Sequence, residues 1–203
     1  MGLYCLGMFF KKLFRRKPVP LGLQPTKGEI YAHVFENPTT GLGRDLYWNV
    51  CVDSQPVFLD GEEWVCSLGI EWLTWPIHRW RELDGMGLGK VRHPELVECS
   101  LYLFDEHHPA SLRHLELQEN GPGTFEAEFS AVADVDDGSG RRLFNVSGRC
   151  NLTFTSIIVV ASNLRPKPAS TLEARVAAAE FIAFDDLKEP RSEEWRYVFE
   201  PIV

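Results

Sequence analysis

The chain has 203 residues, of which 44% are hydrophobic and 25% are charged, the composition of a folded globular domain rather than of a disordered chain. The net charge of −8 is uneven: the basic residues among positions 11–17 are the only charges in the first twenty residues, and the remainder carries −13. Phosphate contacts need clustered lysine and arginine, so this acidic body argues against nucleic acid as a ligand. It fits a basic protein partner, or an acidic surface that serves solubility alone.

Residues 1–27 differ from the rest and are expected to form a basic, apolar N-terminal arm followed by a proline-rich connector. The positive charges follow the short apolar run, whereas a secretory signal places them before it. The run is also too short to span a bilayer. We expect a frayed cationic arm, with Met8 as an alternative start; contact of residues 1–17 with an anionic membrane surface is the other interpretation. Residues 28–203 are expected to be a single mainly β domain.

The first half of this domain shows regular strand signals separated by turns. The apolar and β-branched runs predict strands at 28–36, 45–52, 57–59, 64–72, 96–104 and 112–118. Residues 73–95 show no regular spacing of apolar residues and contain three closely spaced glycines. We therefore expect an irregular crossover there, with a short helix beginning at Pro76.

The most regular stretch runs from residue 123 to residue 161 and predicts three consecutive antiparallel strands. Residues 125–133 alternate apolar and polar side chains, which is the period of a strand with one buried face. The glycines of segment 136–140 suit a tight turn. Residues 157–160 are apolar on both faces, so this strand is expected to lie centrally in its sheet.

One helix is predicted near the C-terminus. Ser170 and Glu173 fit a capping box, and the alanine-rich run continues to Phe184. A last strand is expected at residues 195–199. The fold class is therefore α+β and mainly β, either an antiparallel sheet or a β-sandwich with one helix near the C-terminus.

The five cysteines are odd in number, widely spaced and without a CxxC pair. Most of them stand in apolar, strand-like runs, as small buried hydrophobic residues do in a reducing compartment. A cytoplasmic location is therefore expected.

Metal and cofactor sites have weak sequence support. His107 and His108 adjoin two acidic residues, and His93 is a further weak candidate ligand. Neighbouring residues in a strand point to opposite faces, so His107 and His108 share a ligand sphere only if the turn brings them together. Solvated turn histidines are the simpler interpretation, and we expect neither a metal nor a cofactor.

The sequence contains none of the familiar catalytic motifs. There is no Gly-x-Ser-x-Gly elbow, no phosphate loop with the required spacing and no cysteine in a nucleophile context. Many active sites have no local signature, so enzymatic activity stays open but is not favoured. An enzyme or small-ligand protein would place its pocket near His78, His93 and His107.

Aromatic and basic residues concentrate between residues 64 and 80, within and beside the irregular crossover. Tryptophan and arginine contribute much of the energy of protein interfaces, and loops often carry binding. We expect two of the four tryptophans there to be buried. The candidate binding residues are Trp75, His78, Arg79, Trp80 and Arg81.

Together these features predict a non-enzymatic cytosolic protein-binding domain whose partner is another protein and not nucleic acid. A small, acidic, β-rich domain without catalytic motifs resembles the bacterial immunity proteins in general profile, which would imply neutralisation of a basic toxin or effector by direct binding. The alternatives are an enzyme or small-ligand or metal-binding protein with a histidine pocket, and a membrane-surface accessory protein that uses residues 1–17.

Overall fold

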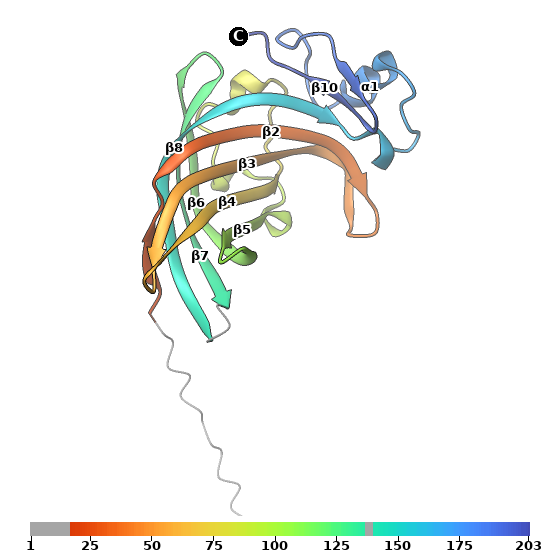
Figure 1. Cartoon of the computed structure of the whole chain (residues 1–203). Coiled ribbons are helices and arrows are strands. Elements are labelled where there is room, and N and C mark those ends of the chain that lie inside the picture. The colour runs from red at the N-terminus through yellow and green to blue at the C-terminus, as the bar shows by residue number, and fades with distance from the viewer. Residues whose placement is uncertain (1–16, 137–139) are drawn as a thin grey trace, which may run out of the picture.

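A computed structural model describes residues 17–136 and 140–203, and the strands found in these ranges belong to one ten-stranded sheet (Figure 1). They are β1 (Val19–Gly22), β2 (Pro25–Asn37), β3 (Leu42–Leu59), β4 (Glu62–Leu73), β5 (Glu98–Leu103), β6 (Glu106–Gly121), β7 (Thr124–Asp136), β8 (Arg141–Val159), β9 (Arg191–Glu193) and β10 (Arg196–Phe199). The predicted mainly β class, with an antiparallel sheet and one helix near the C-terminus, is confirmed. Of the two architectures considered, the single sheet is present and the sandwich is not.

The sheet closes on itself through its longest strand. Strands β2 to β8 are antiparallel neighbours in chain order, and β8 then pairs in parallel with β2, with Ile30 opposite Phe154 and Val34 opposite Val159. Beyond the end of its pairing with β7, β8 takes β10 as its other neighbour. Central placement in the sheet explains why the last residues of β8 are apolar on both faces, as the sequence indicates.

The space enclosed by the sheet is filled by aromatic side chains. Phe154 of β8 stacks on Trp80, with ring centroids 5.0 Å apart, and lies 5.9 Å from Trp48 of β3. Trp48 in turn lies 6.3 Å from Trp75. Trp75 and Trp80 come from the predicted crossover, which carries the 3₁₀ helices η1 (Trp80–Leu83), η2 (Leu88–Lys90) and η3 (Pro94–Leu96). This irregular segment therefore supplies part of the core.

The predicted proline-rich connector differs from the structure, because most of it belongs to the sheet. Strand β1 pairs in parallel with β8, and β2 begins already at Pro25. Leu21 and Leu23 are buried in the core. Proline fixes a φ that suits an edge strand, so the prolines did not exclude strand structure here. The predicted arm, residues 1–16, lies outside the described residues.

Helix α1 (Thr171–Ala178) begins as predicted but ends earlier than expected. Ser170 Oγ accepts the amide of Glu173 at 3.2 Å, and the Glu173 carboxylate accepts the amide of Ala169 at 2.9 Å. After Ala178 the backbone turns, and the amide of Ala183 donates to the carbonyl of His78. A tertiary hydrogen bond thus replaces the next helical turn. Among the helices of the described ranges, which also include η4 (Ala161–Asn163), none has the length and apolar character to cross a membrane.

The closure of the sheet requires a glycine at position 28 of β2. A Cβ atom there would lie 2.5 Å from the Sγ of Cys150 and 2.7 Å from the carbonyl oxygen of Asn151 on β8. These separations are shorter than van der Waals contact, and the backbone of β8 cannot yield as a surface side chain would. Only glycine lets the two strands approach this closely.

We predict that Gly28→Ala lowers the free energy of unfolding by about 1–3 kcal/mol, because the added methyl group overpacks the junction of β2 and β8. Gly43→Ala is the matched control, since a Cβ atom at Gly43 meets nothing within 4 Å. Urea unfolding of the two variants measures the difference. Equal stability of both would contradict the close approach.

Candidate functional site

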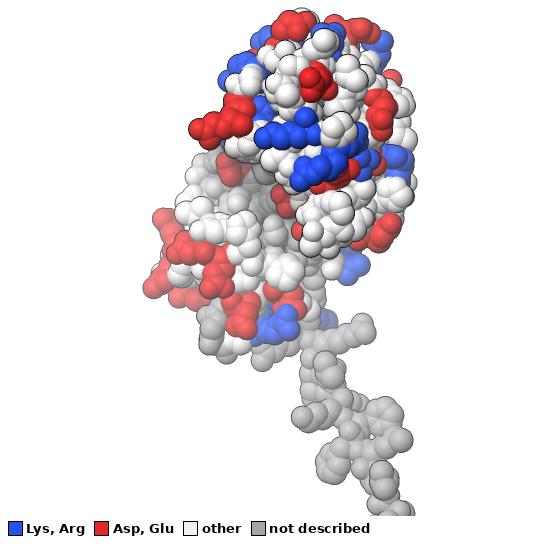
Figure 2. Space-filling model, turned by 90° about the vertical axis from the view of Figure 1, so that its right-hand side faces the viewer, with Lys and Arg blue, Asp and Glu red and all other residues white. Residues whose placement is uncertain are grey.

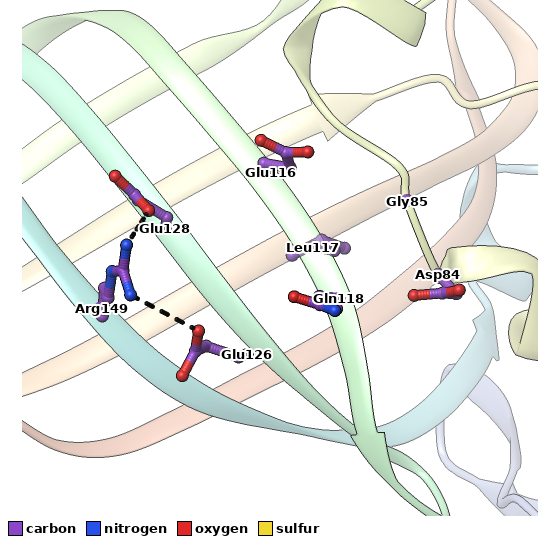
Figure 3. Close-up of a pocket in the computed structure, with 8 residues that line it drawn as sticks. All are labelled: Asp84, Gly85, Glu116, Leu117, Gln118, Glu126, Glu128 and Arg149. Atoms are coloured by element: carbon purple, nitrogen blue, oxygen red, sulfur yellow. Dashed lines mark hydrogen bonds and ion pairs between the residues drawn. The ribbon is translucent and has the colours of Figure 1, made fainter.

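A cleft of about 430 Å³ lies on the outer face of β6, β7 and β8 (Figure 3). The register places Glu116 of β6 opposite Glu128 of β7, and Glu128 opposite Arg149 of β8. Two residues further along β6, Gln118 stands opposite Glu126. The lining residues are Asp84, Gly85, Glu116, Leu117, Gln118, Glu126, Glu128 and Arg149.

Carboxylates outnumber basic groups in this cleft by four to one. Arg149 contacts Glu128 at 2.7 Å and Glu126 at 3.9 Å, and these ion pairs are the dashed lines in Figure 3. Asp84 accepts the amide of Glu119 at 2.8 Å. Glu116 faces the like charge of Glu128 and has no ion pair with any residue of the described ranges. Like charges placed opposite each other in a sheet are destabilising, so a cation would improve this arrangement.

The loop that forms one side of the cleft is held against the edge of β6. The amide of Gly85 donates to Leu117 and that of Leu117 to Met86, at 2.9 and 2.8 Å. Gly87 lies so close to this edge that a Cβ atom would come within 2.5 Å of the carbonyl of Leu115. Strand β5 is short and pairs with β6 only at residues 106–110. The loop forms hydrogen bonds with backbone groups of β6 beyond the end of this pairing, and it holds Asp84 beside the strands.

The cleft continues into two further hollows of the same face. One, of about 540 Å³, shares Glu128 and Arg149 with it, and the other, of about 490 Å³, shares Gly85 and Glu116. Together they form an elongated depression over β6, β7 and β8, which we call the outer groove. Small-molecule sites are mostly concave and apolar pockets, so this long, charged groove is better suited to a segment of a protein.

Two of the predicted binding residues are core residues. Trp75 is 2% exposed and Trp80 is fully buried. Trp75 donates to the carbonyl of Gly87 at 2.9 Å and Trp80 to that of Asp186 at 3.2 Å. With Trp64 and Trp72 half-buried, the expectation that two of the four tryptophans are buried is confirmed.

The other three predicted binding residues, His78, Arg79 and Arg81, are exposed. Arg79 pairs with Asp185 at 2.8 Å, and Arg81 donates to the carbonyl of Ile202 at 3.0 Å. These contacts tie the C-terminal segment to the body. A binding role for the five residues stays a prediction, and it would rest on these three alone.

The candidate metal ligands occupy different surroundings. His108 is buried, with its ring Nε2 2.9 Å from the carbonyl oxygen of Leu103, whereas His107 is exposed beside Tyr102. His93 lies 3.5 Å from Glu95. Across residues 17–136 and 140–203, no group of three or more histidine, cysteine and acidic side chains is arranged to hold a metal ion.

The four cysteines of the described ranges are free thiols with elevated pKa values. Burial raises the pKa of Cys66 to about 11 and that of Cys99 to about 12. Burial likewise raises the pKa of Cys51 and Cys150. Because the thiolate is the nucleophile, these side chains are weak nucleophiles at neutral pH.

The outer face of β2 and β3 carries a row of rings away from the groove. His33 lies 5.3 Å from Tyr31 and 6.3 Å from Phe35, measured between ring centroids. Burial lowers the pKa of His33 to about 4, and the positive charge of Arg196 acts in the same direction. His33 is therefore neutral in the folded protein at neutral pH.

The outer groove was not predicted, although the sequence contains a signal for it. The alternation in residues 125–133 places Glu126 and Glu128 on the polar face of a strand, and the sequence Asn120-Gly121-Pro122-Gly123 is typical of a hairpin turn before it. A register shift between Glu119 and Gly121 separates these strands from the turn, so counting back from the turn does not give the pairing of Glu116 with Glu128. Asp84 carries no such signal, because its position depends on the loop packed against β6.

Comparisons with known proteins give no match to any family model, curated protein or solved structure.

We predict that acid weakens the fold through His33. The unfolded chain binds a proton at this residue as the pH falls below about 6.5, whereas the folded protein does so only near pH 4. The free energy of unfolding therefore falls as the pH drops from about 6.5 to about 4. His33→Phe lacks the titrating group, so between pH 7 and pH 4.5 its free energy of unfolding should fall by about 2 kcal/mol less than that of the wild type. Urea unfolding at several pH values measures it; parallel pH profiles for wild type and variant would refute the assignment.

Proposed function

We propose that this protein is a non-enzymatic binding domain whose outer groove accepts a basic segment of another protein. The observation that carries the proposal is the set of four carboxylates around the single guanidinium of Arg149. Glu116 lacks a cationic partner among the described residues and faces Glu128. Lysine or arginine side chains of a partner would supply the missing positive charge, and complementary charge also speeds the encounter.

The charge distribution over the rest of the domain supports a basic partner. Segments 45–78 and 93–112 contain ten carboxylates and no lysine or arginine. In Figure 2 acidic side chains form a cluster at the lower left of the face in view, whereas lysine and arginine concentrate on the upper part, where acidic side chains also occur. A basic protein would therefore approach in a preferred orientation.

The specific form of the proposal is an immunity-type role in the cytoplasm, in which the domain neutralises a basic toxin or effector by direct binding. The free thiols of the described cysteines fit a reducing compartment. The product of a neighbouring gene is the natural first candidate partner. Size-exclusion chromatography of the two purified proteins at low and at moderate salt tests this form.

We predict that a fluorescently labelled octalysine peptide binds the full chain at low salt and is released as salt shortens the Debye length from about 10 Å at 0.1 M to about 3 Å at 1 M. The double variant Glu116→Gln with Glu126→Gln should weaken binding by about five- to tenfold, since each exposed charge pair contributes a modest amount. Fluorescence anisotropy measures the affinity.

Glu180→Gln with Glu194→Gln is the matched control, because it also removes two exposed carboxylates, and neither of them lines the groove. Its affinity for octalysine should stay within about twofold of wild type. If the control weakens binding as much as the groove variant does, the peptide responds only to net charge and the groove is not the site. An octaglutamate peptide should not bind.

A further inference from the structure

Two large apolar side chains are exposed side by side on the outer face of the β3–β4 hairpin. Phe58 is 70% exposed and Val65 is 60% exposed. Their neighbours Val57 and Trp64 point inward and pack against the core, so Phe58 and Val65 point outward. They are diagonal neighbours across the two strands, since Phe58 stands opposite Glu63, a separation within the reach of an aromatic side chain.

Carboxylates border this apolar pair. Glu63 stands directly across from Phe58 on the same face, whereas Glu62 stands across from Leu59, which packs against the core, and borders the pair only at the turn end of the hairpin. Both glutamates are exposed, and neither forms an ion pair with another residue of the described ranges. We call Phe58, Val65, Glu62 and Glu63 the hairpin patch. It combines an apolar centre with negative charge and therefore fits a segment that is both aromatic and basic.

The chain enters the sheet beside this patch. Strand β1 leads into β2 along the end of β3, where the amide of Gln24 donates to Ser54 Oγ at 3.0 Å and the amide of Gln55 donates to the carbonyl of Gln24 at 2.8 Å. Figure 1 shows the first described strand reaching the same end of the sheet as the turn between β3 and β4. The described part of the chain therefore begins close to the hairpin.

The segment just before Lys17 has the complementary composition. Residues 9–16 read FFKKLFRR, which is four large apolar and four basic side chains without an acidic one. Eight residues span at most about 28 Å when extended, several times the spacing of about 4.8 Å between neighbouring strands. The tether is thus long enough to cover the patch, and its short length gives a high effective concentration there.

We propose that residues 9–16 of the same chain dock on the hairpin patch. The phenylalanines of the segment cover Phe58 and Val65, and its lysines and arginines neutralise Glu62 and Glu63. This goes beyond the binding function proposed above, because the patch shares no residue with the outer groove. It also gives residues 1–17 a binding surface on the protein itself, in place of a membrane.

The test places a photo-cross-linking amino acid in the full chain as Phe58→p-benzoylphenylalanine. The control carries the same group at Val176, which is 68% exposed on α1. After irradiation of a mixture of light and heavy isotope-labelled protein, mass spectrometry identifies the linked peptides. We expect links from position 58 to residues 9–16 within one chain, about tenfold more than from position 176.

Three outcomes would overturn the proposal. Links between light and heavy chains would make a second copy the occupant. Equal capture of residues 9–16 from positions 58 and 176 would mean that the arm has no preferred surface. Links from position 58 that never include residues 9–16 would exclude docking.

Carbodiimide cross-linking of the unsubstituted side chains gives an independent measurement. Lys11 and Lys12 should form amide links with Glu62 or Glu63 within one chain. These links should disappear in Glu62→Gln with Glu63→Gln, exposed substitutions that leave the core unchanged. If Lys11 and Lys12 form links only with other carboxylates, docking on this patch is contradicted. This outcome does not depend on whether octalysine binds the outer groove.

Discussion

The pairing of β8 with β2 is the constraint on which the rest of this structure depends. It turns a meander of antiparallel strands into a closed sheet, and it is possible only where the two strands approach each other at Gly28. Closure satisfies the backbone of both strands and leaves no long free edge between them. It also defines an interior, which Trp48, Phe154 and the tryptophans of the crossover fill.

Because side chains fill the interior, the candidate binding site lies on the outer face of the sheet. The crossover that contributes Trp75 and Trp80 to the core also returns along the edge of β6, and there it positions Asp84 beside the glutamates of β6 and β7. The same packing thus builds the core and one side of the outer groove. Arg149 neutralises part of the negative charge and helps the strands to stay paired, but the groove keeps a net negative charge. The binding function proposed for the groove follows from this imbalance.

The sequence predicted what periodicity and turn chemistry determine. Alternation in residues 125–133, the apolar end of β8 and the cap at Ser170 were all identified correctly, because each is a local property of the chain. Closure was missed, since the parallel pairing of β2 with β8 joins segments more than a hundred residues apart. The groove was missed for a related reason: carboxylates on separate strands and a loop become one site only through register. Trp75 and Trp80 look like binding residues in sequence, yet tertiary packing buries them.

Mapping the binding site of a basic probe tests most directly whether a basic partner occupies the outer groove. Titration of the ¹⁵N-labelled full chain with octalysine would be followed through the backbone amide shifts of every strand. We expect the largest changes at the outward-facing positions of β6, β7 and β8 around Glu116, Glu126 and Glu128, with little change in α1. Changes spread evenly over all carboxylates, or centred on the exposed residues His78, Arg79 and Arg81, would contradict it.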